Sequence, residues 1–499
     1  MNRFEFRQGR VWLAALLALL CGAVAAQDVT AQAVKLYEKH LYEDASRLLR
    51  PQLATMDSQS LPSAQLSLGM IHLRSAELYS ELQRNALVIE TDYLKKLASQ
   101  KGADASRYVD LYLGQALVED AKYSEGARHL QRFLSNTGLA PDFVASGKVA
   151  LGVALWGQRQ TDKANALWRS VPSTQPEAKA ALAAAYALVG AQDRRPVPMA
   201  DEAAADAKKL GKPLGARISN QLLRAYSRSD APEKALELLR TSELGSASYV
   251  EVLGKSKSIS FYDPGLLGNL AQANLRAAIQ YLELARREPK LASTAAYFLA
   301  DAYLLAGNTA QAQAQAAAFL SQPQIPAPYR AHARASQAVA LYKSGKQRDA
   351  SLIWTELAEQ SAAQPALLAE VMQACTQALA DCSKFEQRAI ASTEAGEGKK
   401  YFSLNAALGK YYLTRKDYAR AELYMEAGRD KANKNKIEVN DPTMLAGLSQ
   451  AYFHTKKFSE SLEIYFEMSK QYPAVRQIQD ALQGIYATEQ KSAGDVKIF

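Results

Sequence analysis

Two cysteines seven positions apart, Cys375 and Cys382, are the residues whose types and spacing most directly suggest chemistry. They are the only cysteines that remain if Cys21 is removed with an N-terminal leader. In an oxidising compartment a close pair is more often bridged than free. On one straight helix their Cα atoms would lie about 10 Å apart, which exceeds the limit of about 7 Å for a disulfide. A bond therefore requires the helix to break near Ala380 and Asp381.

We favour a structural disulfide over the two alternatives, a pair of reduced thiols and a redox-active pair. Neither CxxC nor CxxCH occurs in the chain. The sequence therefore contains neither the motif of thioredoxin-like redox proteins nor that of covalent haem attachment.

Other catalytic motifs are also missing. No HExxH metal motif, GxSxG nucleophile turn or complete phosphate-binding loop occurs, and Gly396–Lys399 lacks the earlier glycine and the hydroxyl residue of such a loop. We therefore expect no enzymatic activity, no metal and no cofactor. An enzyme site around Phe261, Tyr262 and Asp263 is the alternative that remains. The histidines are scattered along the chain, at His40, His72, His129, His332 and His454.

The N-terminus has the three parts of a secretory signal peptide. Arg3, Arg7 and Arg10 precede the apolar run Val11–Leu20, and the small residues Ala23–Ala26 follow it. This order predicts a signal peptide over residues 1–26 with cleavage after Ala26. Lipid attachment at Cys21 is disfavoured, because a bulky leucine rather than a small residue precedes that cysteine.

The rest of the chain lacks membrane-spanning and nucleic-acid-binding features. No stretch approaches the about 20 uninterrupted apolar residues that a transmembrane helix requires. We therefore expect a soluble mature protein, which in a bacterium is periplasmic. The 499 residues contain 60 Lys and Arg and 51 Asp and Glu, a net charge of +9. These charges are interspersed along the chain, whereas a nucleic-acid-binding protein usually concentrates its basic residues on one face.

A repeated pattern of side-chain volumes runs through the chain and predicts paired helices. A small residue is followed three positions later by Tyr or Leu and twelve positions later by a second small residue, as in Gly409, Tyr412 and Ala421. The small residues are expected where two helices touch, and the large one beside them. The pattern also fits Ala33, Leu36, Ala45; Gly114, Leu117, Gly126; Gly152, Leu155, Ala164; Leu223, Tyr226, Ala235; Ala300, Tyr303, Ala312; Ala338, Leu341, Ala350; and Ser449, Tyr452, Ser461.

This arrangement resembles the tetratricopeptide repeat (TPR) family, whose unit of about 34 residues is an antiparallel helix pair. The resemblance implies an all-α fold, a right-handed α-solenoid of stacked helix pairs. We expect an N-terminal solenoid over residues 27–244, an irregular linker or insertion over 245–264, and a C-terminal solenoid over 265–499. The pattern also fits poorly at Arg194–Pro198, where a proline-containing insertion replaces the turn between two helices.

The resemblance further implies where a partner would bind. In this family the first helix of each pair lines a concave groove, with side chains one, four and five positions after the first small residue facing it. Aromatic residues such as Trp156, Tyr342 and Phe453 would serve as anchors for a peptide or helix, although each residue could instead pack against a neighbouring helix. The predicted groove residues are Gln115, Val118, Glu119, Trp156, Asp301, Leu304, Tyr342, Lys343, Lys410, Thr414, Gln450, Phe453 and His454.

The sequence therefore indicates a binding protein. We expect a periplasmic scaffold or adaptor that binds other envelope proteins in an assembly, export or energy-transduction complex, including a membrane-associated one. The alternative is a polysaccharide-binding or polymer-guiding module of an export system, which a groove of carboxylates and stacked aromatic rings would favour. The partner, the pathway and the oligomeric state stay open.

Overall fold

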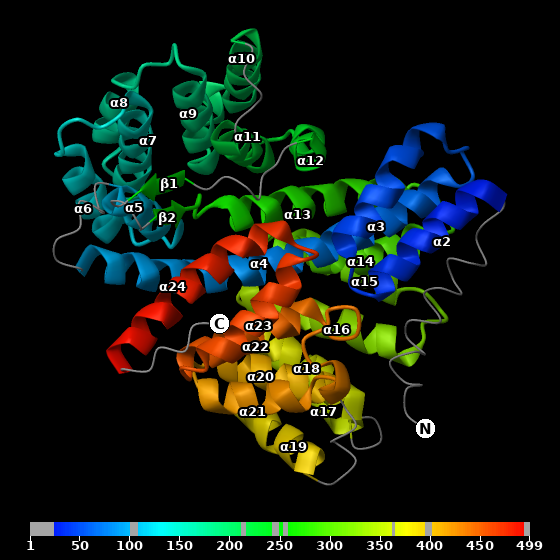
Figure 1. The fold of residues 1–499 in the computed structure, drawn as a ribbon. Helices are drawn as coiled ribbons and strands as arrows, with labels where there is room; N and C mark the ends of the chain where they lie inside the picture. Colours follow the sequence, from blue (N-terminus) through cyan, green and yellow to red (C-terminus); the bar gives the residue numbers. More distant parts are fainter. Residues whose placement is uncertain are drawn as a thin grey trace. The chain divides into compact units, whose positions relative to one another are not determined.

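The computed structural model describes residues 24–99, 108–210, 216–241, 249–252, 258–361, 365–394 and 402–493. The protein is an all-α solenoid of helix pairs, with one short β-hairpin in the described part of the chain (Figure 1). Most of the predicted signal peptide, residues 1–23, lies outside the described residues.

The chain divides into two compact units, each built from two separate stretches of sequence. Unit 1 contains residues 1–78 and 277–467, and unit 2 contains residues 79–276 and 468–499. The divisions at 78/79 and 276/277 fall inside two long helices, α4 (Leu61–Ser99) and α13 (Leu266–Ala285). The expected division into solenoids 27–244 and 265–499 therefore differs from the observed one, because continuous helices contribute to both units.

Unit 2 contains four helix pairs followed by the hairpin. Its paired helices contact one another along the row, as α5 with α6, α6 with α7 and α9 with α11. The C-terminal segment of this unit is the 3₁₀ turn η7 (Pro473–Val475) and α24 (Arg476–Ala493). The paired helices are α5 (Val109–Glu119), α6 (Tyr123–Leu134), α7 (Pro141–Gly157), α8 (Thr161–Arg169), α9 (Pro176–Leu188), α10 (Pro196–Lys209), α11 (Ala216–Arg228) and α12 (Pro232–Thr241).

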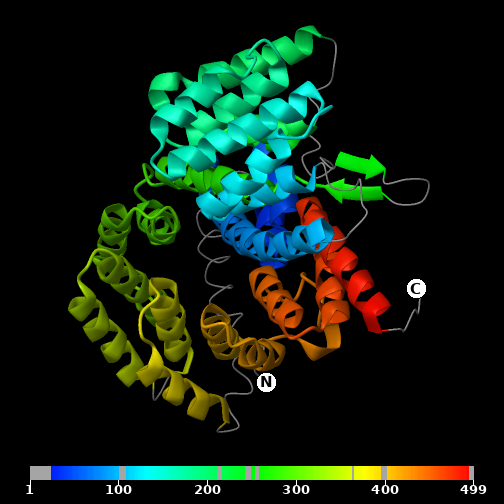
Figure 2. The same cartoon turned by 90° about the vertical axis from the view of Figure 1, so that its left-hand side faces the viewer.

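Unit 1 begins with α2 (Val24–Glu38), α3 (Tyr42–Leu49) and the 3₁₀ turn η1 (Arg50–Thr55). Its later pairs follow one another along a curved row, from α14 in green through yellow to orange (Figure 2). These helices are α14 (Ala292–Leu305), α15 (Thr309–Leu320), α16 (Ala327–Lys343), α17 (Gln347–Gln360), α18 (Pro365–Ala378), α19 (Ser383–Glu394), α20 (Phe402–Thr414), α21 (Tyr418–Ala427), α22 (Pro442–His454) and α23 (Phe458–Ser469), with η6 (Lys431–Asn433) between α21 and α22.

A recurring turn joins the two helices of most pairs. One residue has a positive φ, and the N–H of the next residue donates to a carbonyl five positions earlier, as Asp417 does to Tyr412 at 3.0 Å. This Schellman bond satisfies a carbonyl that the end of the first helix leaves unpaired. In seven of the eight pairs recognised from the sequence, all except that of Leu223, Tyr226 and Ala235, the acceptor is the middle residue of the volume pattern: Leu36, Leu117, Leu155, Tyr303, Leu341, Tyr412 and Tyr452.

Small residues lie where the paired helices touch, as the sequence predicts. A Cβ atom at Gly114 would lie 3.1 Å from the carbonyl oxygen of Gly126 on the partner helix. In the last pair, Ser449 Oγ lies 2.8 Å from Ser461 Oγ, and both serines are fully buried. Any larger side chain at these positions would push the two helices apart.

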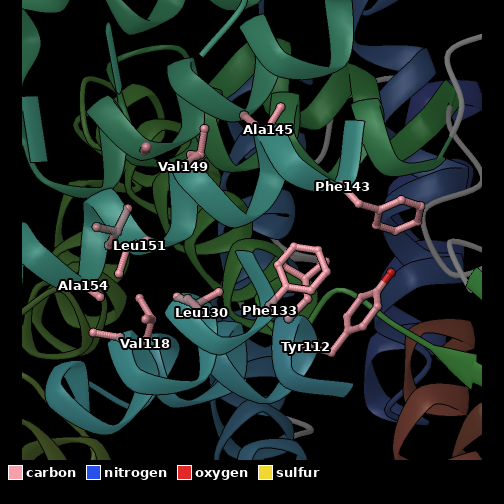
Figure 3. Packing of buried hydrophobic residues seen from close by; sticks show 14 of the residues in the cluster. Tyr112, Val118, Leu130, Phe133, Phe143, Ala145, Val149, Leu151 and Ala154 are labelled. Carbon is pink, nitrogen blue, oxygen red and sulfur yellow. The ribbon is translucent and has the colours of Figure 1, made fainter. Parts of the chain in front are cut away.

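Large residues fill the space next to these contacts. Trp168 of α8 lies against Gly152 of α7, and its indole N–H donates to the carbonyl of Val149 at 3.1 Å. Figure 3 shows Val118 of α5, Leu130 of α6 and Leu151 of α7 pointing into one interior. The core of unit 2 is therefore continuous from pair to pair.

The segment predicted as an irregular linker, 245–264, contains regular structure. Strand β1 (Tyr249–Val252) pairs antiparallel with β2 (Ser258–Phe261), with Tyr249 opposite Phe261 and Val252 opposite Ser258. The alternation of Val, Ile and Phe with polar residues here suits a strand rather than a helix. The described part of the linker is thus a β-hairpin that leads into Tyr262, Asp263 and α13.

The disulfide closes the turn between α18 and α19. Cys375 and Cys382 are bonded, with Cα atoms 5.9 Å apart. Helix α18 ends at Ala378 and α19 begins at Ser383, so the helix breaks in the interval that such a bond requires. Leu379 in this turn has a φ of 57° and is exposed.

Filling the contact at Gly152 should destabilise unit 2. In Gly152→Val the added methyl groups would overlap the Trp168 indole, at an expected cost of about 1–3 kcal/mol. Urea unfolding and hydrogen exchange of α7 and α8 would measure this. Ala166→Val adds the same kind of side chain on the exposed face of α8 and should change stability by less than about 1 kcal/mol. Equal effects of the two substitutions would contradict the packing argument.

Removing the disulfide should destabilise the α18–α19 pair. A disulfide across so short a loop is worth about 2–3 kcal/mol in the chain-entropy model. The variant with both Cys375→Ala and Cys382→Ala should therefore show faster hydrogen exchange in α18 and α19 and a lower unfolding midpoint. Reductant should reproduce the effect in the original protein and leave the double variant unchanged. A reductant effect on the double variant would refute this explanation.

Candidate binding groove

The first helices of the four pairs in unit 2 line one groove. The segment after β2, Asp263 and Pro264, lies at the same groove. The lining residues are Leu111, Tyr112, Gln115, Val118 and Glu119 of α5; Asp142, Ser146, Val149, Ala150 and Val153 of α7; Glu177, Ala181, Ala185 and Leu188 of α9; and Arg217, Ile218, Asn220, Gln221 and Arg224 of α11.

Helical spacing places these side chains on one face of each helix. On α11, for example, Arg217, Asn220, Gln221 and Arg224 are separated by three or four residues, which is the spacing of one helix face. The groove has two adjoining sections that share five lining residues. Including the solvent at its open side, the inner section, at Glu119 and Arg224, measures about 460 Å³, and the outer section, at Asp142 and Glu177, measures about 650 Å³.

A charge network occupies the inner section. Arg224 Nη2 lies 2.6 Å from Glu119 Oε1 and 3.6 Å from Asp263 Oδ1. Burial alone would lower the pKa of Arg224, but these two carboxylates raise it overall. The Arg224 and Glu119 side chains are mostly buried and little hydrated, so each charge is stabilised mainly by the other. This pair therefore links α5 to α11 across the groove.

The position of Asp263 depends on the residues around it. Its carboxylate accepts a hydrogen bond from the Gly265 N–H at 2.8 Å, and the Gln221 amide lies 3.5 Å away. The hydroxyl of the preceding residue, Tyr262, donates to Asp480 of α24. The chain that follows the hairpin is thus held at Tyr262 and at Asp263, and the Asp263 carboxylate lies at the groove.

Two further ionisable groups lie behind this network. Burial, together with the charge of Asp263, raises the pKa of Glu90 to about 8. Burial also lowers the pKa of Arg228, which interacts with Glu119, and its Nε has no hydrogen-bond partner among the described residues. Glu90 is therefore mainly protonated at neutral pH, and it adds no negative charge next to Asp263.

The outer section contains hydrogen-bonding groups without internal partners. Asn220 is 1% exposed, and neither its side-chain oxygen nor its nitrogen has a hydrogen-bond partner within the described structure. The Glu177 carboxylate likewise makes no ion pair or hydrogen bond with any described residue. Buried amides are normally hydrogen-bonded, so Asn220 offers a donor and an acceptor to a molecule in the groove.

The structure brings together the groove residues predicted on the first pair of unit 2. Gln115, Val118 and Glu119 all line the groove, and the Gln115 amide donates to Ser146 Oγ at 3.0 Å. Trp156 does not line it. Its ring stacks on Trp168, 5.8 Å away between centroids, and contributes to the core. Trp156 is half-buried and packs against neighbouring helices, which is the alternative to its expected role as an anchor for a partner.

In unit 1 the predicted residue Asp301 is part of a polar cluster. His332 of α16 hydrogen-bonds to Asp301 of α14 and to Glu370 of α18, at 2.8 Å each, and Ser336 donates to Asp301. Burial would lower the pKa of His332, but the two carboxylates raise it well above its usual value. A protonated His332 thus links three successive first helices, and Asp301 has a structural partner.

The other predicted residues of unit 1 do not line either groove section. Leu304 and Phe453 are buried in the core, at 3% and 5% exposure, so Phe453 is not a groove anchor. Tyr342 packs on Trp354 and His454 stacks on Tyr418. Thr414 donates to the carbonyl of Tyr411 at 2.7 Å. Lys343 and Lys410 are exposed, and Gln450 is half-buried.

Two kinds of feature are absent from the described residues. They contain no group of three or more His, Cys, Asp or Glu side chains that could hold a metal ion. Of the helices in the described ranges, none combines the length and the apolar character needed to cross a bilayer.

Replacing Glu90 by glutamine should make unit 2 more stable at alkaline pH. The pKa of Glu90 is raised from 4.5 to about 8 on folding, so the folded protein holds a proton that the unfolded chain loses. This carboxyl therefore costs stability progressively as pH rises from about 4.5 to 8. The free-energy difference between Glu90→Gln and the original protein should grow over that range and level off above it.

Denaturant unfolding at pH 5, 7 and 9 would measure this difference. Glu202→Gln on exposed α10 is the matched control and should give a small difference that does not grow with pH. A pH-independent effect of Glu90→Gln would show that the Glu90 carboxyl is not protonated in the folded state.

No protein-family model matches the chain, and no curated protein matches it. Among solved structures it is similar to yeast Tom70, with 12% sequence identity, a TM-score of 0.32, and coverage of 94% of this chain and 97% of the other. The assignment as an all-α solenoid of TPR-like helix pairs therefore depends on the turns and inter-helix contacts of this chain.

Proposed function

We propose that this protein is a secreted scaffold that holds an extended segment of a partner protein in the groove of unit 2. The observation that carries the proposal is the buried Asn220 amide, which lacks an internal partner and lies at a groove lined by four successive first helices. An extended peptide has an N–H and a C=O at each residue. Such a peptide would satisfy both atoms of the amide.

The composition of the groove supports a peptide more than a glycan. Its walls combine aliphatic side chains, such as Val118, Val149 and Val153, with a few amides and carboxylates. Tyr112 is the single aromatic residue among the described lining residues. A polysaccharide site would be expected to stack sugar rings on several aromatic faces. The groove contains carboxylates, but its described lining does not contain the stacked aromatic rings that would also be expected for a glycan.

We place this scaffold in the bacterial periplasm, in a cell-envelope assembly, export or energy-transduction complex. Two features support the location: the signal-peptide pattern of residues 1–26 and the disulfide, since disulfides persist in oxidising compartments. Fractionation of cells that express the full chain would test it. Recovery of an uncleaved protein in the cytoplasm would contradict it.

Replacing Asn220 by leucine should raise stability and lower partner binding. Leucine has a similar volume and removes a buried polar group without a partner, which is worth about 1–3 kcal/mol. It also removes the proposed hydrogen bonds to the ligand, with an expected loss of at least about tenfold in affinity, or about 1.4 kcal/mol. If Asn220 had only a structural role, the Asn220→Leu protein would be less stable than the original.

The partner can be captured by a photo-crosslinking amino acid at Ser146 in the groove. The same residue at Lys163, on exposed α8, is the control. We expect a discrete adduct at Ser146 that Asn220→Leu weakens and that is absent at Lys163. If both crosslinking variants are stably folded, identical adducts at Ser146 and Lys163 would contradict binding in this groove. The absence of any adduct would contradict it as well.

A further inference from the structure

The lining of the groove carries more negative than positive charge. It contains four carboxylates, Glu119, Asp142, Glu177 and Asp263, but only two guanidinium groups, Arg217 and Arg224. Each arginine is already paired, because Arg217 Nη1 lies 2.7 Å from Asp142 Oδ2 and Arg224 is paired with Glu119. Among the described residues, Glu177 therefore has no compensating cation, and Asp263 shares Arg224 at 3.6 Å.

The excess negative charge is greatest in the outer section. Of the described residues that line this section, Asp142, Glu177 and Asp263 are acidic and Arg217 alone is basic. Arg228 interacts with Glu119, Arg224 and Arg276 at the inner end, and neither Arg228 nor Arg276 belongs to the lining. These additional positive charges therefore offset the inner carboxylates and leave Glu177 unbalanced.

We propose that the outer section selects a lysine or arginine side chain of the bound segment, with its cationic group at Glu177 and Asp263. Asn220 lies in the same section and lacks a partner, so a ligand main chain bonded to its amide would bring a side chain close to both carboxylates. A charge-assisted hydrogen bond is about twice as strong as a neutral one. This inference rests on the proposed function and names the ligand chemistry of that groove.

A peptide rather than a small polyamine fits the length of the groove. The two sections adjoin and extend over several turns of each first helix, for example from Asp142 to Val153 on α7. The inner section adds aliphatic walls around Val118, Val149 and Leu188, which suit an apolar side chain. The ligand is thus a segment with an apolar residue followed or preceded by a basic one.

Selection from a random dodecapeptide library would test both levels of the proposal. The original full-length protein is the bait, and Ser146→Trp, which fills the centre of the groove, removes peptides that bind elsewhere. We expect enriched peptides to contain Lys or Arg beside an apolar residue. One such peptide would then be synthesised with its basic residue, with norleucine and with glutamate at that position, and binding measured by fluorescence anisotropy at two salt concentrations.

The basic peptide should bind the original protein at least about tenfold more tightly than the norleucine peptide. High salt should reduce this preference. Glu177→Gln should remove most of the preference while leaving norleucine binding unchanged, and Glu202→Gln outside the groove should have no effect. Circular dichroism and thermal unfolding would verify that each variant is folded.

The outcomes separate the two proposals. Enriched peptides without a preference for basic residues, or a preference that Glu177→Gln leaves intact, would overturn the cation inference and leave peptide binding in place. Spermidine that displaces the peptide at comparable concentrations would show that the site takes small polyamines instead. No enrichment over Ser146→Trp would overturn the groove function itself, and the inference with it.

Discussion

The close approach of two helix backbones within each pair is the constraint on which the rest of the structure depends. At Gly114 and Gly126 the backbones are so close that no side chain fits between them, and at Ser449 and Ser461 only two hydroxyls fit. The Schellman turn reverses the chain within a few residues and keeps the helices in this register. Large side chains such as Trp168 then fill the space beside each contact and join one pair to the next.

The groove follows from this stacking. Because successive first helices lie side by side with the same face outward from the core, side chains from α5, α7, α9 and α11 converge on one surface. The two units use their first helices differently. In unit 2 they leave Asn220 and Glu177 without a hydrogen-bond partner among the described residues, whereas in unit 1 His332 joins Asp301 and Glu370 in a closed set of hydrogen bonds.

The sequence is informative where geometry demands one kind of residue and uninformative where several solutions exist. The small residues at Gly152 and Gly409 and the turn glycines Gly307 and Gly345 could be predicted, because no larger residue or ordinary conformation is compatible there. The α9–α10 and α18–α19 pairs were not apparent. They use the same turn, with bonds to Tyr186 and Cys375, but a 3₁₀ turn at Gln192–Arg194 lengthens the first and the disulfide reinforces the second. The strands β1 and β2 escaped notice because each is only four residues long.

The groove was only partly predictable for a related reason. Spacing from Gly114 gave Gln115, Val118 and Glu119 correctly, since these follow the small residue by less than two turns. The same rule did not place Trp156 in the groove lining, because a large ring one position before the helix end can pack against the core. Asn220, Glu177 and Asp263 were missed. The first could have been found from its spacing with Arg217 and Arg224 on one helix face, but nothing local indicates that Asp263 returns to the groove.

The interleaving of the two units along the chain has a consequence for biogenesis. The N-terminal pair α2–α3 belongs with helices that follow residue 277, and α24 belongs with helices that precede it. As the chain emerges during synthesis, its first hairpin and the start of α4 are made long before the helices after residue 277 that complete unit 1. Neither unit can be completed vectorially, so the nascent protein exposes apolar helix faces until late and depends on protection from aggregation until its last helix arrives.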